Sequence, residues 1–161
     1  MQKRIVGSAL GIFASVVICA VAQAQSADPW LGTWKVDPAK STYSPGPKPA
    51  GAGTVTIERS GDSMKTTIDG TNAQGQPTHT ETVWMFDGKD HPVKGAPAPN
   101  ATAAYKRVDD RSFEVTSKAD GKVIMTTRVS SSPDGKTMTA TQTGQNAQGE
   151  SVKNTIVALK Q

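Results

Sequence analysis

Two histidines and a glutamate are the side chains in this sequence whose types and spacing could bind a metal ion. His79 and Glu81 are two positions apart, and His91 follows after a short interval. Two imidazoles and a carboxylate could hold zinc if they converged on one point. In a strand, however, placing Trp84 in the core sends His79 and Glu81 to solvent, because alternate residues share a face. We therefore predict no metal site here.

The other reactive residues form no recognisable catalytic arrangement. The sequence lacks a G-x-S-x-G motif that would hold a serine nucleophile on a sharp turn. Asp109 and Asp110 would point to opposite faces if extended, so they indicate a turn rather than an acid–base pair. Gly51-Ala52-Gly53 is followed by no helix whose N-terminus could bind phosphate. We predict no catalytic residue, no cofactor and no enzymatic activity.

Nearly all of the chain after residue 25 consists of short segments in which apolar and polar residues alternate, as in β-strands. No stretch there has the periodicity of a helix. Val55 and Ile57 share one face, as do Phe113 and Val115, with polar residues between them. Frequent threonines favour strands through their stiff β-branched side chains. We predict ten strands, at residues 33–37, 54–59, 64–69, 78–86, 89–93, 102–108, 112–117, 122–130, 136–143 and 152–160.

The connections between these segments predict their topology. Asp-Gly pairs at 87–88, 120–121 and 134–135 are typical of tight hairpins, because both residues tolerate positive φ. Hairpins in series form an antiparallel meander whose connections alternate between two ends. If 89–93 is a strand, the short turns fall mostly at one end and the longer loops, such as the proline-rich 38–53, at the other. The sequence thus predicts an all-β, antiparallel up-and-down meander barrel of about 8–10 strands, with a closed base and a looped mouth.

The tetrapeptide Asn-Ala-Gln-Gly occurs twice, at 72–75 and 146–149. Each copy lies between two predicted strands. A duplicated half-barrel and a favourable polar loop used twice explain this equally well.

The N-terminus has the pattern of a cleaved signal peptide. Lys3 and Arg4 precede an apolar stretch, and Ala22-Gln23-Ala24 has small residues where signal peptidase reads them. A retained membrane anchor would need roughly 20 apolar residues, and the stretch is shorter. We predict cleavage of residues 1–24, leaving 25–161 as one domain in the periplasm or secreted. Because Cys19 is the only cysteine, the exported chain would lack disulfides and cysteine-based sites.

The charge of the chain is small and evenly spread. Removing Lys3 and Arg4 lowers the formal charge from +4 to +2. Nucleic acids and anionic membranes would need a concentrated positive face, so neither is expected as a partner. The predicted outer faces carry Lys, Glu and Thr without aromatic girdles, which argues against an outer-membrane barrel. We expect a monomer with no membrane span after processing.

The segment Trp30-Leu31-Gly32-Thr33-Trp34-Lys35 opens the predicted meander with a Gly-x-Trp motif. In this respect the chain resembles the calycin barrels, which are the lipocalins and the intracellular fatty-acid-binding proteins. It looks most like an exported bacterial lipocalin-like protein. The resemblance implies that Gly32 and Trp34 form the barrel floor, with Trp34 under a basic residue from the chain end, either Lys153 or Lys160.

The chain also departs from those families. The fatty-acid-binding proteins carry two lid helices after the first strand, whereas prolines at 45, 47 and 49 cannot continue a helix. Their last strand holds an Arg-x-Tyr pair that grips a carboxylate, and residues 154–159 contain no such pair. The lipocalin disulfide is absent as well. The resemblance therefore does not imply a preference for fatty acids, and no helical lid is expected.

Alternation of side chains predicts which residues face the barrel interior. Methionines mixed with hydroxyl groups suit a modestly apolar small molecule better than a long acyl chain, because methionine adapts to irregular shapes. Aromatic residues in small barrels more often fill the interior than stack on ligands. Trp84 and Tyr105 are the expected polar-tipped contacts. The predicted ligand-binding residues are Met64, Thr66, Ile68, Trp84, Tyr105, Phe113, Met125 and Met138, with Val115, Thr127 and Ala140 as further lining.

Two functions remain open from the sequence. The first is an exported, non-catalytic binding protein that holds a small apolar or amphipathic molecule in the barrel. The second is a filled-core interaction module that binds a protein or envelope component through its proline-rich loops or a sheet edge. The hydrophobic content of 35% is low for a roomy pocket and keeps the second function in play.

Overall fold

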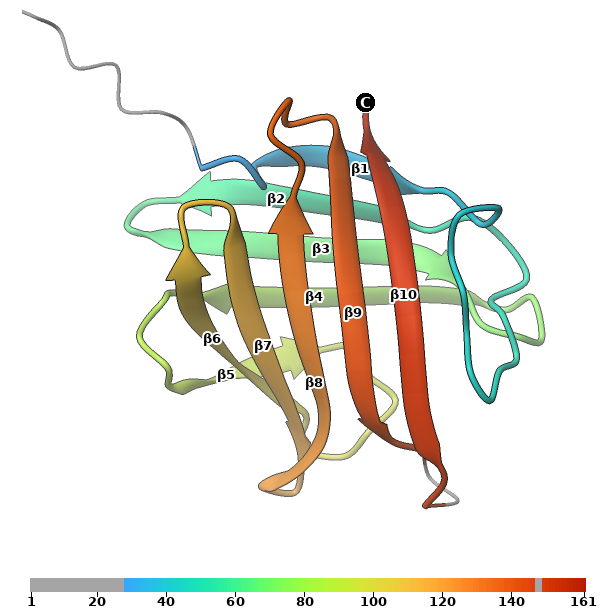
Figure 1. Ribbon diagram of the computed structural model, residues 1–161. Coiled ribbons are helices and arrows are strands. Elements are labelled where there is room, and N and C mark those ends of the chain that lie inside the picture. Colours follow the sequence, from blue (N-terminus) through green and yellow to red (C-terminus); the bar gives the residue numbers. More distant parts are fainter. Residues whose placement is uncertain (1–27, 147–148) are drawn as a thin grey trace, which may run out of the picture.

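The computed structural model describes residues 28–146 and 149–161, which form one closed antiparallel barrel (Figure 1). Each strand pairs with its neighbours in sequence, and the last strand closes onto the first. The strands are β1 (Gly32–Val36), β2 (Thr54–Ser60), β3 (Ser63–Thr71), β4 (Pro77–Trp84), β5 (Asp90–Lys94), β6 (Thr102–Asp109), β7 (Ser112–Ala119), β8 (Lys122–Ser131), β9 (Thr137–Gln145) and β10 (Ser151–Lys160). The predicted fold class is confirmed.

The signal sequence predicted at residues 1–24 lies outside the described residues, so its cleavage stays a prediction. Within the described part of the chain, no helix is long and apolar enough to cross a bilayer.

The barrel has its shortest strand pairing at β5. This strand pairs with only Glu81 and Thr82 of β4. It reaches three residues of β6 on its other side. The proline at position 92 can donate no backbone hydrogen bond, which limits the ladder here. The strand predicted at 89–93 nevertheless exists, shifted by one residue to Asp90–Lys94, so the predicted alternation of short turns and long loops holds.

Figure 1 shows β1–β4 running across the direction of β6–β10, as two sides of one barrel. The backbone N–H of Lys160 donates to the carbonyl of Lys136, which places the chain end beside the β8–β9 turn. The short turns therefore gather at this closed end. The longer β1–β2 and β3–β4 loops lie at the opposite end, which forms the mouth.

The Gly-x-Trp segment seals the closed end. Trp34 is fully buried, and its indole N–H donates a 2.8 Å hydrogen bond to the carbonyl of Trp30. The ammonium of Lys160 lies 5.1 Å from the centre of the Trp34 ring, so Lys160 and not Lys153 covers it. Gly32 has φ +124°, and a Cβ there would lie 3.0 Å from Cε of Lys160. Only glycine fits both the backbone and the lysine stem.

Five aromatic side chains pack directly above this seal, and we call them the aromatic floor: Trp30, Trp84, Phe86, Tyr105 and Phe113. Trp84 and Tyr105 stack in parallel with ring centres 4.0 Å apart. Trp30 meets Phe86 and Phe113 edge to face, with ring centres 5.6 and 5.1 Å away. These contacts give the closed end a densely packed core, because aromatic pairs add attraction beyond the area they bury.

Asp28 ties the first described residues across the closed end. Its carboxylate accepts hydrogen bonds from Arg59 on β2 at 2.6 Å and from Arg107 on β6 at 2.7 Å. The Arg107 guanidinium in turn lies 4.8 Å from the Trp30 ring centre and 4.6 Å from that of Phe86. One carboxylate thus holds two strands and orients a cation against the floor.

The β1–β2 connection follows the mouth without forming a helix. Thr42 pairs with Thr155 of β10 through two backbone hydrogen bonds. The carbonyl of Ser44 accepts a further bond from the N–H of Lys153. The segment therefore extends the β1 edge along β10 before the prolines carry it across to β2.

Candidate ligand cavity

A cavity of about 510 Å³ lies inside the barrel and opens toward the mouth. All ten strands contribute residues to it, as does the β1–β2 connection through Tyr43 and Pro49. Its volume falls within the range of about 300–1,000 Å³ that is usual for small-molecule sites. The barrel interior is therefore hollow above the aromatic floor.

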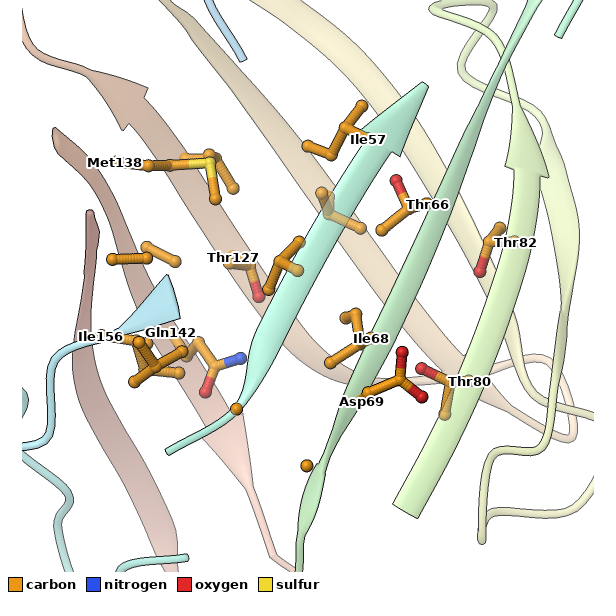
Figure 2. A pocket seen from close by; sticks show the side chains of 18 of the residues that line it. Ile57, Thr66, Ile68, Asp69, Thr80, Thr82, Thr127, Met138, Gln142 and Ile156 are labelled. Atoms are coloured by element: carbon orange, nitrogen blue, oxygen red, sulfur yellow. The ribbon is translucent and has the colours of Figure 1, made fainter. Parts of the chain in front are cut away.

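One side of the cavity carries hydroxyl groups. Thr80 and Thr82 are alternate residues of β4, and Thr66 lies opposite Thr82 on β3. Figure 2 shows these three side chains together on one side, and we call them the threonine wall. Thr82 also hydrogen-bonds the buried phenol of Tyr105 at the base of the wall. Burial raises the pKa of Tyr105 to about 12, so the phenol stays protonated well into the alkaline range.

The facing side is aliphatic. Met138 and Ala140 of β9 and Ile156 and Ala158 of β10 line it. In the barrel order β9 lies five strands from β4, so the two faces oppose one another. Figure 2 shows Met138 and Ile156 across the cavity from the threonine wall. The site thus has one hydroxyl face and one apolar face.

An amide pair links the cavity to the mouth segment. Asn154 of β10 donates from Nδ2 to Oε1 of Gln142 at 3.0 Å and accepts the N–H of Ser44 at 3.2 Å. This contact fixes which end of the Gln142 amide faces inward. Figure 2 shows its nitrogen pointing into the cavity, where it offers a neutral hydrogen-bond donor.

Asp69 is the one charged residue among the described residues that line the cavity. Its carboxylate lies 2.7 Å from Nδ1 of His79, which is more than half exposed. The hydrogen bond that this carboxylate accepts from the ring is the main cause that raises the pKa of His79 above its ordinary value. Asp69 is therefore engaged at the outer surface.

The structure brings together five of the eight predicted ligand-binding residues around the cavity: Thr66, Ile68, Tyr105, Phe113 and Met138. The further predicted lining residues Val115, Thr127 and Ala140 lie there too. Their contact with a ligand stays a prediction.

The other three predicted residues lie elsewhere. Met64 and Trp84 belong to the packed core, with exposures of 5% and 0%. The indole N–H of Trp84 is directed to Thr66 rather than to the cavity. Met125 borders a second, smaller hollow beneath the proline-rich loop, beside Tyr43 and Pro45. The alternation of side chains correctly predicts that these residues face the barrel interior. It does not predict which inward residues belong to the packed core and which line the cavity.

Gln142 is the functional-site candidate that the sequence analysis missed. It continues the inward series of Met138 and Ala140 by two more positions. The alternation could have found it, but a polar side chain near a strand end did not suggest an interior position.

The predicted outward face of β4 is confirmed. The side chains of His79 and Glu81 are 58% and 32% exposed, whereas Thr82 is buried. His91 lies 2.9 Å from Asp87 instead of approaching His79. Across residues 28–146 and 149–161, no group of three His, Cys, Asp or Glu side chains is placed to hold a metal ion.

No protein-family model and no curated protein matches the chain. Among solved structures, it is similar to zebrafish ileal bile acid-binding protein in complex with cholic acid, with a TM-score of 0.53 and 11% identity. The match covers 83% of this chain and 99% of the zebrafish chain. At this identity the likeness concerns the fold alone. The predicted resemblance to the calycins is confirmed at that level, and the chain has a calycin-type barrel fold.

Proposed function

We propose that this protein is an exported, non-catalytic binding protein that holds a small apolar or amphipathic molecule inside its barrel. The single observation that carries the proposal is the cavity of about 510 Å³ above a tightly packed aromatic floor. Its opposed hydroxyl and aliphatic faces suit a guest with one polar and one apolar side. The proposal includes a monomer in the periplasm or outside the cell, as the N-terminal sequence suggests.

The zebrafish protein supports this proposal by analogy. It was solved with cholic acid bound, so a barrel of this fold can accept a small amphipathic molecule. The low identity carries no ligand across to the present chain.

The alternative function required a filled core, and the hollow interior does not favour it. Partly exposed apolar residues do occur on β4 and next to it, at Val83 and Met85, with exposures of 50% and 41%. Single apolar residues of this kind are common on protein surfaces. Binding of an envelope protein therefore remains the second candidate and an outcome to look for.

A neutral fluorescent dye, N-phenyl-1-naphthylamine, tests the proposal. We expect saturable binding of about one dye per chain, because the cavity is of the usual size for one small molecule. The fluorescence emission of the dye measures the binding. The variant Ala140→Phe should abolish this by filling the aliphatic face. The matched variant Thr141→Phe places the same ring on the outer face and should bind normally.

Absence of saturable binding by the unmodified protein, or equal binding by Ala140→Phe, would contradict a cavity-based function. Native mass spectrometry of protein isolated from its own cells adds an independent readout. A bound small molecule there would support the proposal, whereas a stoichiometric protein partner would favour the alternative.

A further inference from the structure

We propose that the cavity selects an uncharged guest with a hydroxyl or carbonyl edge and rejects carboxylates and other organic anions. This inference rests on the proposed function and names the ligand class of the same site. It follows from the charges around the cavity and from the arrangement of its neutral polar groups.

No cationic side chain lines the cavity within the described part of the chain. Cations of the neighbouring strands are engaged with carboxylates away from it. Lys65 lies 2.8 Å from Glu81 on the outer face, and Lys118 lies 2.9 Å from Asp90. An anion entering the barrel would find no partner for its charge.

Two arginines lie near the closed end but cannot reach a guest. Arg107 packs over the rings of Trp30 and Phe86 and bonds to Asp28. Arg59 shares the same carboxylate. Neither arginine lines the cavity, and both guanidinium groups are bonded to the carboxylate of Asp28.

The one charged lining residue has the wrong sign for an anion. Asp69 is negative, occupies the mouth end of β3 and bonds His79 at the outer surface, so it offers an entering anion no attraction. A buried ion without a counter-ion is strongly disfavoured, because protein groups do not replace its lost hydration. An organic anion would therefore lose more on entering than its apolar part gains.

Neutral polar groups, in contrast, are available on both sides of the cavity: the threonine wall on β3 and β4, and Thr127 of β8 and Gln142 of β9 beside the aliphatic face. Thr80 and Thr127 line the cavity, and their hydroxyls have no partner among the described residues. Thr66 accepts the indole N–H of Trp84 and keeps its own O–H to donate. The amide nitrogen of Gln142 adds a donor near the mouth. These groups match a hydroxyl or carbonyl edge, while the aliphatic face receives the rest of the guest.

Two dyes that differ in one group test the charge rule. N-phenyl-1-naphthylamine is neutral, and 8-anilino-1-naphthalenesulfonate is the same skeleton with a sulfonate. We expect the neutral dye to bind saturably and the sulfonate to bind at least about tenfold more weakly. Comparable affinities would overturn the inference and leave the binding function standing. Failure of both dyes to bind would overturn the proposed function and the inference with it.

A charge placed inside the cavity should reverse the selection. Gln142→Arg is expected to tighten sulfonate binding by about tenfold and so to narrow the difference in affinity between the two dyes. The matched variant Thr143→Arg carries the same charge one residue on, on the outer face, and should leave both affinities unchanged. An equal gain from both arginines would show that the sulfonate binds outside the barrel and overturn the inference.

The hydroxyl edge is tested by competition with the bound neutral dye. We expect 2-naphthol to displace it at lower concentration than 2-methylnaphthalene, by about threefold or more. Thr80→Val should reduce this preference, and the outward Thr67→Val should retain it. Equal displacement by the two compounds in the unmodified protein would contradict a role for the hydroxyl face.

Discussion

The indole N–H of Trp84 donates a 2.8 Å hydrogen bond to Oγ1 of Thr66, where the aromatic floor meets the cavity. Trp84 is completely buried and stacks on Tyr105. The hydrogen bond satisfies the polar atom that such a position would otherwise leave unpaired. It also fixes the lowest member of the threonine wall, so floor and cavity share a residue.

Replacing Thr66 with valine removes this acceptor while keeping the side-chain shape. The buried indole N–H then has no partner, and we expect the free energy of unfolding to fall by about 1–3 kcal/mol. Urea unfolding followed by tryptophan emission measures the change. Thr67→Val on the outward face of the same strand is the control and should alter stability by no more than about 0.5 kcal/mol. Equal losses in the two variants would contradict the assigned role of the hydrogen bond.

Local patterns were sufficient to predict the barrel. Alternation gave the strands, the Asp-Gly turns gave their antiparallel order, and Gly32 with Trp34 marked the closed end. The depth of the aromatic floor was beyond these patterns. Whether Met64 and Trp84 touch a cavity or lie beneath it depends on how rings from four separate segments stack, and side-chain periodicity carries no such information.

Long-range polar contacts were equally hidden in the sequence. Asp28 meets Arg107 at a separation of 79 residues, and Ser44 meets Asn154 at 110. Such pairs have no sequence spacing that marks them. Asn154 also bonds Gln142, so the contact that orients the Gln142 amide was hidden in the same way.

Gly32 provides a test of the motif itself. Gly32→Ala forces a side chain into φ +124° and against the stem of Lys160, so we expect a loss of about 1–3 kcal/mol in unfolding free energy. Near-ultraviolet circular dichroism should also report a changed environment for Trp34. Gly70→Ala is the control, because its φ lies outside the left-handed region and its Cβ would make ordinary contacts of 3.5 and 3.6 Å. A Gly32→Ala protein as stable as Gly70→Ala would contradict the proposed constraint.

Asp28 is expected to stabilise the closed end well beyond an ordinary surface pair. Its side chain is only 12% exposed and bonds two arginines, so Asp28→Asn should lower the free energy of unfolding by about 1–3 kcal/mol. Lys40→Ala removes an exposed pair with Asp37 at 3.5 Å and should cost no more than about 0.5 kcal/mol. Chemical unfolding of both variants compares them directly. If Asp28→Asn lowered the free energy of unfolding no more than Lys40→Ala, the hydrogen bonds from Arg59 and Arg107 to Asp28 would not stabilise the closed end.

The buried phenol of Tyr105 predicts how stability depends on alkaline pH. Its pKa is raised from 10.0 to about 12 in the folded protein, chiefly by burial. Between these values the unfolded chain loses the phenolic proton while the folded chain keeps it. Rising pH therefore favours unfolding, and the contribution of this group falls by up to about 2.7 kcal/mol between pH 10 and 12. Below pH 10 both states are protonated, so the group causes no pH dependence there.

Tyr105→Phe keeps the ring stacked on Trp84 but removes the ionisable proton, so the decline between pH 10 and 12 should become shallower. Denaturant unfolding at half-unit steps of pH measures it, and absorbance at 295 nm follows the phenolate directly. Tyr43→Phe is the matched control, because Tyr43 is much less buried at the cavity mouth, although burial raises its pKa as well. If Tyr105→Phe lost stability as steeply as the unmodified protein, the phenol could not be buried between the aromatic floor and Thr82. The contact between Tyr105 and the threonine wall would then be wrong.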